Sequence, residues 1–301
     1  MMKDKKQTCK DVYDRYHKFP GDTSEGRVLT VLFSIIGAII SLIGVISMNF
    51  NFFKFDTYKY TANEYLLDGD FKDISLKLIE QRVQILKSTD GKAKIVSFER
   101  EKMQISYSIS GDLLSIKQEN HRKWYDYIGI STKKQTLTLY LPDDIYSSLT
   151  ISNVTGDIDV DSDFTFDSAT VKTTTGDINF KAKVNKDLKI TLTTGDIDIA
   201  GEFLCENINV VLTTGDINLS NIKALNSINL KSTTGDISFT NCDALSTTIK
   251  TTTGDIIGSF STPKVITAKT TTGKISIPSI SLGDNCKLST TTGNIKITFL
   301  N

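Results

Sequence analysis

Residues 211–220 read V-L-T-T-G-D-I-N-L-S. The word T-G-D-I in this stretch, or a close variant, occurs eight times in the C-terminal half at spacings of 19 or 20 residues. Each copy has threonine before the glycine and isoleucine two positions after it. A constant period of this length predicts a repeat architecture. The repeated residues are Gly156, Gly176, Gly195, Gly215, Gly235, Gly254, Gly273 and Gly293, with Ile158, Ile178, Ile197, Ile217, Ile237, Ile256, Ile275 and Ile295.

Apolar residues alternate with polar ones on both sides of each glycine. Ile208 and Val210 precede Gly215, and Ile217 and Leu219 follow it. Alternation with period 2 predicts strands. The apolar residues before the glycine lie at odd distances from it in sequence, and those after it at even distances. A continuous flat strand would therefore point the two sets to opposite faces, so the chain must bend or bulge at the glycine to bring both sets into one core. A third, looser apolar site falls eight to ten residues after the glycine, at Phe164, Phe166, Val184, Phe203, Cys205, Leu225 and Leu245.

Three inward faces in about 20 residues predict one rung of a β-solenoid, in which similar rungs stack at the inter-strand spacing. The predicted fold is therefore all-β: an extracellular, β-helix-like solenoid of eight rungs over residues 149–301. The less regular β region 69–148 is expected to cap it. The last rung ends at residues 295–301, and we expect this C-terminal edge to accept a partner strand or to self-associate.

The N-terminal region predicts a membrane anchor. Residues 28–53 contain no charged side chain, and the run is long enough to cross a bilayer as a helix. The lysines and arginines near the run lie mainly before it, which predicts a cytoplasmic N-terminus, an extracellular C-terminal domain and location in the cell membrane as a single-pass protein. The expected organisation is a cytoplasmic tail 1–27, a transmembrane signal-anchor helix 28–50 and a juxtamembrane linker 51–68.

Composition argues against several classes of function. Lys plus Arg and Asp plus Glu each number 35, so a chain of zero net charge lacks the field that nucleic-acid binding requires. Only two histidines occur, and no cluster of acid, Arg and His stands apart from the repeat. The sequence therefore predicts no enzyme, no catalytic residue, no bound cofactor and no nucleic-acid partner.

The chain resembles a known family. Strands are followed by G-D-L-L-S-I at 111–116, by L-T-L-Y-L-P at 137–142 and then by the T-G-D-I coils. This order is similar to the bacterial putative-adhesin family of β-strand-repeat domains of unknown function, over about residues 70–301. Some members, the LiaG-like ones, are single-span envelope proteins encoded with envelope-stress systems. The resemblance implies a repeat domain of the cell envelope and brings no catalytic residues with it.

The residue after each glycine is acidic in six rungs, which would stack the carboxylates into a ladder. One interpretation is structural, because aspartate accepts backbone or hydroxyl hydrogen bonds at a bend. The other is a calcium ladder, because calcium prefers carboxylate oxygens. The threonines before the glycines suit strands and cross-strand hydroxyl pairs. The carboxylates are Asp157, Asp177, Asp196, Asp216, Asp236 and Asp255.

Two other groups of residues have structural and functional interpretations. The stretch His121-Arg122-Lys123-Trp124-Tyr125 contains the only Trp, and could contact sugar rings or anionic lipid heads, or could anchor a half-buried loop. Cys205, Cys242 and Cys286 fall in different rungs and repeat phases, so we expect buried small hydrophobic residues and no disulfide framework. Cys9 belongs to the predicted cytoplasmic tail.

Taken together, the sequence predicts a membrane-anchored envelope protein whose non-catalytic solenoid serves binding, adhesion or scaffolding, with a possible link to envelope stress. Its expected partners are the lipid bilayer and an envelope protein or cell-wall polymer. Two alternatives stay open. One is a β-helical enzyme acting on polysaccharide, since some such proteins use paired carboxylates. The other is an accessory sensor of envelope state.

Overall fold

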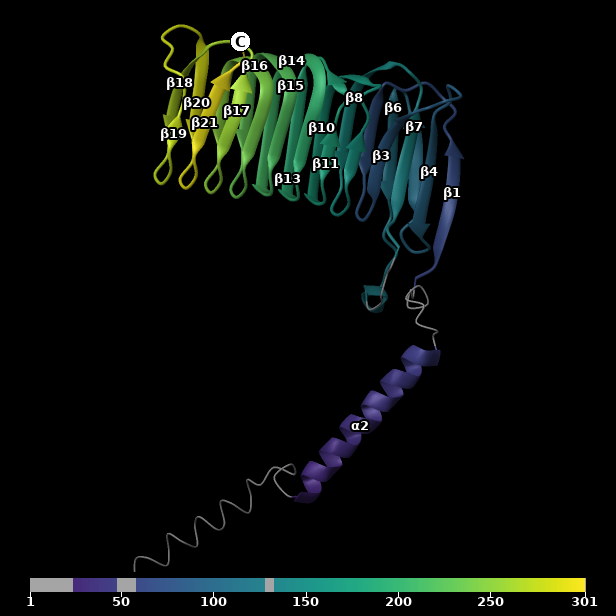
Figure 1. The fold of residues 1–301 in the computed structure, drawn as a ribbon. Helices are drawn as coiled ribbons and strands as arrows, with labels where there is room; N and C mark the ends of the chain where they lie inside the picture. Colours follow the sequence, from purple (N-terminus) through teal and green to yellow (C-terminus); the bar gives the residue numbers. More distant parts are fainter. Residues whose placement is uncertain (1–23, 48–57, 128–132, 301) are drawn as a thin grey trace, which may run out of the picture. The chain divides into compact units, whose positions relative to one another are not determined.

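The structure is a computed structural model of the chain and describes residues 24–47, 58–127 and 133–300. The chain divides into two compact units, residues 1–57 and 58–301. In the first unit, α2 (Ser24–Ser47) is a helix of 24 residues (Figure 1). Within the described residues, no helix has the length and hydropathy needed to cross a membrane. Residues 1–23 and 48–57, which hold most of the expected tail and part of the expected linker, lie outside the described residues.

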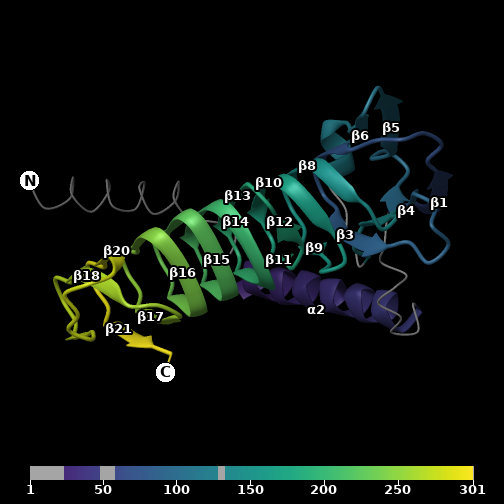
Figure 2. The same cartoon turned by 90° about the horizontal axis from the view of Figure 1, so that it is seen from above.

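The second unit is all-β, as the repeat predicts, and its strands stack side by side in one extended sheet (Figures 1 and 2). A short 3-10 helix, η2 (Trp124–Tyr127), lies between β6 and β7. The strands are β1 (Tyr60–Leu66), β2 (Asp73–Lys77), β3 (Arg82–Lys87), β4 (Lys94–Arg100), β5 (Ile105–Ser110), β6 (Leu113–Gln118), β7 (Thr136–Leu141), β8 (Ile145–Ser152), β9 (Ile158–Val160), β10 (Thr165–Thr175), β11 (Ile178–Phe180), β12 (Lys183–Val184), β13 (Asp187–Thr194), β14 (Ile197–Thr214), β15 (Ile217–Lys231), β16 (Ile237–Lys250), β17 (Ile256–Phe260), β18 (Lys264–Lys269), β19 (Ile275–Ser276), β20 (Asp284–Ser289) and β21 (Ile295–Phe299).

Each T-G-D-I word forms the turn between two strands of a rung. Gly215 has φ of +126°, a conformation that side chains disfavour, and the carbonyl oxygen of Gly195 lies 2.0 Å from where a Cβ would stand. The glycine therefore permits both the bend and the close stacking of rungs. Because of this bend, Ile208 before the glycine and Ile217 after it are both buried despite their opposite parity.

One hydrophobic core runs through the unit, from Leu67 to Ile297. The sequence-based prediction of its third face was wrong in two rungs, where Leu225 is 51% and Leu245 60% exposed. Their neighbours at 224 and 244, both alanine, are buried instead. The cause is a left-handed residue earlier in each rung, Asn221 with φ of 59° and Asn241 with φ of 53°, which shifts the alternation by one position.

The last two rungs stack in an order different from their order in the sequence. β16 pairs with β20 and β20 with β18, while β17 pairs with β21 and β21 with β19. The rung of Gly293 thus lies between those of Gly254 and Gly273. In the rung of Gly273, which ends the stack, Ile275 is 39% exposed, although its place in the repeat predicts burial.

This order corrects the expected C-terminal edge. β21 is paired along its whole length with β17, and its residues Ile295 and Lys296 are paired on the other side with β19. The outermost strands are β18 and β19 (Figure 1). A partner strand at this end would therefore meet β18 and β19 first.

At the opposite end of the stack, the order of the rungs also differs from their order in the sequence. β2 and β3 lie between the rung of β8 and β9 and that of β6 and β7, all in parallel register. The region 69–148 thus supplies two further rungs of the parallel stack. Antiparallel strands follow outside them: β5 pairs with β6, β4 with β7, and β1 with β4. Where the rung of β2 and β3 meets the first T-G rung, Glu80 bridges to Thr155, and Val83 pairs with Ile158.

Candidate functional site

The eight T-G turns form a row along one side of the stack, which we call the T-G edge (Figure 1). Its carboxylates connect neighbouring rungs. The Oδ1 atom of Asp196 accepts a hydrogen bond from the backbone N–H of Asp216 at 2.9 Å, and Oδ1 of Asp216 accepts from Asp236 at 2.7 Å. The same bond joins Asp157 to Asp177, Asp177 to Asp196, and Asp236 to Asp255.

This aspartate ladder has a structural role in the stack, since each carboxylate holds the next turn in register. It ends through Asn294, whose N–H donates to Asp255, and Lys274, whose N–H donates to Oδ1 of Asn294. In the described part of the chain, no group of three or more His, Cys, Asp or Glu side chains is placed to hold a metal ion. Each Oδ1 atom of the ladder, from Asp157 to Asp255, accepts a hydrogen bond from a backbone N–H of the neighbouring rung.

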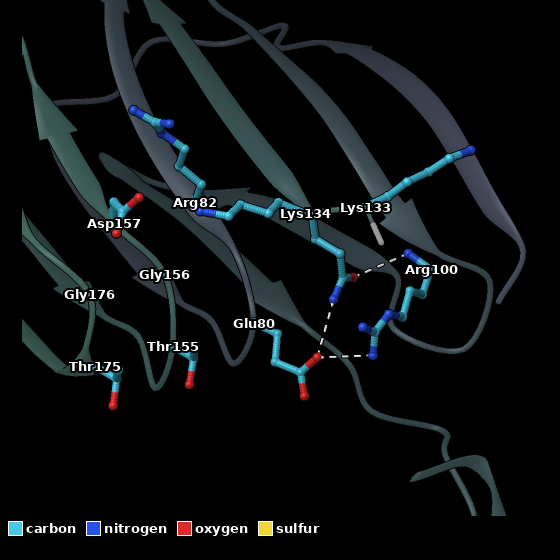
Figure 3. A pocket seen from close by; sticks show the side chains of 11 residues that line it. Glu80, Arg82, Arg100, Lys133, Lys134, Thr155, Gly156, Asp157, Thr175 and Gly176 are labelled. Atoms are coloured by element: carbon cyan, nitrogen blue, oxygen red, sulfur yellow. Dashed lines mark hydrogen bonds and ion pairs between the residues drawn. The ribbon is translucent and has the colours of Figure 1, made fainter. Parts of the chain in front are cut away.

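At the N-terminal end of the T-G edge, a groove of about 490 Å³ lies beside the first T-G turns (Figure 3). β2 and β3 have no T-G-D word in their connection. Glu80 and Arg82 stand there beside the first T-G turn, and Arg82 is also bonded to Asp159 at 3.1 Å. The groove is lined by Glu80, Arg82, Arg100, Lys133, Lys134, Gln135, Thr155, Gly156, Asp157, Thr175 and Gly176.

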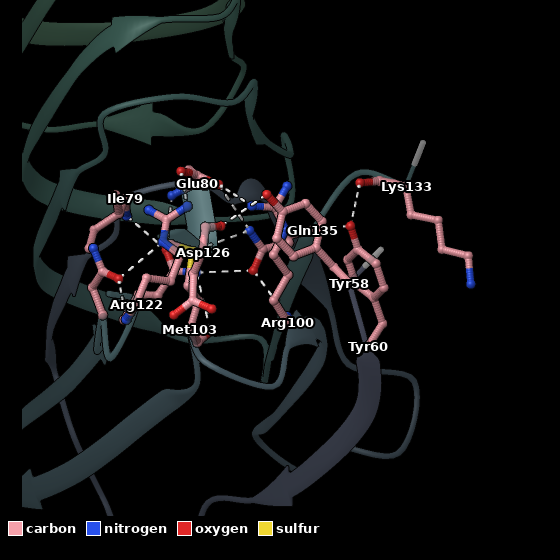
Figure 4. Close-up of polar contacts among 12 residues, drawn as sticks. Tyr58, Tyr60, Ile79, Glu80, Arg100, Met103, Arg122, Asp126, Lys133 and Gln135 are labelled. Atoms are coloured by element: carbon pink, nitrogen blue, oxygen red, sulfur yellow. Dashed lines mark hydrogen bonds and ion pairs between the residues drawn. The ribbon is translucent and has the colours of Figure 1, made fainter. Parts of the chain in front are cut away.

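The groove carries excess positive charge, because four of its side chains are cationic and two are carboxylates. Moreover, Glu80 is already paired: Arg100 Nη1 lies 3.1 Å from its Oε2, and Arg122 Nη1 lies 2.8 Å from its Oε1 (Figure 4). Gln135 donates a further bond to Glu80 at 3.4 Å. Asp157 Oδ1 is engaged in the ladder. Lys133 and Lys134 add two further positive charges to the lining, and the ammonium of Lys133 lies over the rings of Tyr60 and Phe98.

The basic-aromatic stretch divides between two roles. The side chain of Arg122 is only 6% exposed and anchors the loop on Glu80. Trp124, in contrast, is 78% exposed and packs edge-on against Tyr125. His121 lies outside the groove lining, with Nε2 at 3.1 Å from Glu119. The structure thus combines the expected loop anchor with an aromatic pair that stays in solvent.

The described cysteines are buried free thiols. Burial raises the pKa of Cys205 to about 12, of Cys242 to about 11 and of Cys286 to about 12. At neutral pH they are therefore protonated and behave as small hydrophobic side chains. Cys9 lies outside the described residues.

The sequence profile of a family called Toastrack DUF4097 matches residues 71–203 and again residues 181–301. The chain belongs to the Toastrack DUF4097 family. The two matched segments together span the eight T-G rungs and the preceding strands from β2 onwards, in line with the resemblance at residues 111–116 and 137–142.

The chain is also similar to solved structures. A putative adhesin from Parabacteroides merdae is 12% identical, with a TM-score of 0.51, over 82% of this chain and 98% of that one. A putative adhesin from Bacteroides fragilis is 15% identical, with a TM-score of 0.32, over 80% and 97%. One from Parabacteroides distasonis is 10% identical, with a TM-score of 0.38, over 80% and 98%. No curated protein matches the chain. The first of these structures shows the shared fold.

Proposed function

We propose that this Toastrack protein is a membrane-anchored envelope protein that binds an anionic cell-wall polymer without cleaving it. The cationic groove carries the proposal, and the similarity to putative adhesins supports a binding role. LiaG-like envelope proteins provide the corresponding organisation, a single span followed by a repeat domain. A link to envelope stress would follow from that organisation.

The anchor in this proposal is the uncharged run 28–53, which overlaps α2 from residue 28 to residue 47. Large apolar side chains of α2 are exposed around the helix, which is favourable in lipid and unfavourable in water. The cations that precede the run favour a topology with the tail inside and the β unit outside. The exposed side chains are Val31, Leu32, Phe33, Ile35, Ile36, Ile39, Ile40 and Ile43.

The groove suits a polymer because it opens onto the T-G edge. Lys133 and Lys134 supply positive charge, and the exposed threonines Thr155 and Thr175 supply hydroxyl groups at the spacing of neighbouring strands. A chain bearing phosphate or carboxylate groups could bind its charges at the lysines and continue along the threonines. Phosphate and carboxylate share the same recognition chemistry here.

The test measures binding of the full chain, in phosphatidylcholine nanodiscs, to poly(glycerol phosphate), to alginate and to neutral dextran. We expect both polyanions to bind and dextran not to. Lys133→Gln with Lys134→Gln should weaken binding about fivefold to tenfold, because each exposed charge pair contributes roughly 0.2–1 kcal/mol. Added salt should weaken binding of the unsubstituted protein.

The matched control is Lys231→Gln with Lys250→Gln. These lysines are exposed and adjacent on neighbouring rungs, so the pair changes net charge equally but lies away from the groove. We expect it to leave affinity unchanged within about twofold. An equal loss in both double variants would mean that net charge, and not the groove, drives binding.

A further inference from the structure

We infer that the Trp124 loop, residues 119–127, docks on the anionic surface of the membrane that holds the anchor. The inference rests on the proposed anchoring and adds a second contact with the bilayer. Two aromatic side chains of this loop are exposed, Trp124 to 78% and Tyr125 to 48%, although aromatic side chains gain more from burial than most others. Both belong to η2, which protrudes on the side of the T-G turns (Figure 1).

The loop is held in place by contacts with Lys102 and Glu80 of the β unit. The backbone N–H of His121 donates to the carbonyl of Lys102 at 2.9 Å, and Lys102 Nζ lies 2.6 Å from Asp126 Oδ1. This hydrogen bond lowers the pKa of Asp126 and raises that of Lys102, so both stay charged at neutral pH. Arg122 adds its buried pairing with Glu80. The aromatic pair is thus presented on a pre-organised loop, which reduces the entropy lost on docking.

The start of the β unit is tied to the same loop. The hydroxyl of Tyr58 donates to the backbone carbonyl of Asp126 at 3.0 Å, and the Arg100 guanidinium lies over the Tyr58 ring at 4.3 Å (Figure 4). The proposed anchor helix ends at residue 50, eight residues before Tyr58. Eight residues span at most about 29 Å even when fully extended. The loop is therefore restricted to the neighbourhood of the point where the chain would leave the bilayer.

The chemistry of the loop suits a membrane surface. Trp and Tyr favour the headgroup region, where the ring is apolar and the N–H or O–H remains hydrated. Lys123 adjoins the aromatic pair, with Nζ 6.0 Å from the Tyr125 ring. Each lysine near an anionic surface contributes about 1 kcal/mol. The loop has two carboxylates that oppose this attraction: Asp126 is only 14% exposed and paired with Lys102, and the more exposed Glu119 lies 3.1 Å from Nε2 of His121.

The test uses the fact that Trp124 is the only tryptophan of the chain. The full chain is reconstituted in vesicles of phosphatidylcholine and phosphatidylglycerol, with and without lipids brominated near the headgroup. We expect the brominated lipids to lower Trp124 fluorescence about twofold, because the ring lies at the interface. We also expect a blue-shifted emission and protection from acrylamide. Lys123→Glu should reduce all three effects.

The control moves the tryptophan to the other end of the stack. Leu282, between β19 and β20, is 81% exposed, so Trp124→Phe with Leu282→Trp gives an exposed reporter far from the loop. We expect no quenching of this reporter by brominated lipid. Equal quenching of both reporters would overturn the inference, as would a Trp124 emission that shifts on addition of a polysaccharide and not with vesicles.

Protease treatment of the same vesicles separates the two proposals. If a C-terminal tag is cleaved in outward-facing molecules and Trp124 is not quenched, the anchoring stands and the docking of the loop is refuted. If the chain fails to remain in the vesicles after alkaline washing, the anchoring is refuted and the docking with it. Equal quenching in pure phosphatidylcholine would refute the preference for an anionic surface.

Discussion

Gly215→Ala is expected to unfold the central rungs and to cost about 4 kcal/mol or more in unfolding free energy. The new Cβ would lie 2.0 Å from the carbonyl oxygen of Gly195 and 2.9 Å from Asp196 Oδ1. Neither atom can yield without breaking the stack, because Asp196 Oδ1 holds the next turn and the rung spacing is set by strand pairing. Thermal unfolding of the full chain in detergent, followed by circular dichroism, measures the effect.

Gly111→Ala is the matched control. Gly111 also has a positive φ, +56°, but nothing lies within 4 Å of its would-be Cβ. Only the backbone preference is then lost, and we expect a cost of about 1–2 kcal/mol. Equal destabilisation by the two substitutions would show that the close stacking of the turns is not what requires glycine at the T-G edge.

Ile217→Asp is expected to be at least as damaging, with loss of about 5 kcal/mol or more. Ile217 is fully buried between the equivalent isoleucines Ile197 and Ile237. The substitution removes the roughly 1.5–3 kcal/mol gained by burying the side chain and places an unpaired charge in the core. Because each rung is stabilised by its neighbours, the unfolding should spread beyond one rung. Urea unfolding and hydrogen exchange of the neighbouring rungs measure both effects.

Leu225→Asp tests whether burial, and not apolar character alone, makes a repeat position sensitive to substitution. Leu225 lies in the same strand, β15, and its place in the repeat predicts an inward side chain, but it is half exposed. We expect this substitution to change stability by less than about 1 kcal/mol. A loss comparable with that of Ile217→Asp would place Leu225 in the core and contradict the left-handed corner at Asn221.

The regular part of the fold was readable from the sequence because it depends on local alternation. Strands on both sides of each glycine and the bend at the glycine follow from the T-G-D-I words alone. The third face was predicted less well, since its register is set by one backbone conformation, at Asn221 and Asn241. Asparagine is one of the few residues that adopts the left-handed region readily, so its recurrence at the same repeat position was the available signal.

The stacking order at the ends was not predicted, because it depends on contacts between rungs that are not adjacent in sequence. A signal was nevertheless present. A turn at the end of the ladder has no following turn to hold, so it needs no carboxylate, and the one lysine in the series is Lys274. The groove was missed for a related reason: Glu80 and Lys134 lie in connections without a T-G-D word, and Arg82 begins the strand that follows the first of them.

The most direct test of the central claim is the chain length of a polyanion before and after incubation with the protein. The full chain, in phosphatidylcholine nanodiscs, is kept overnight with poly(glycerol phosphate) and separately with alginate, and each polymer is sized by chromatography with light scattering. We predict that protein and polymer elute together and that the polymer released by high salt has its original length. Progressive shortening of either polymer would contradict the account and establish an enzyme that cleaves glycosidic or phosphodiester bonds.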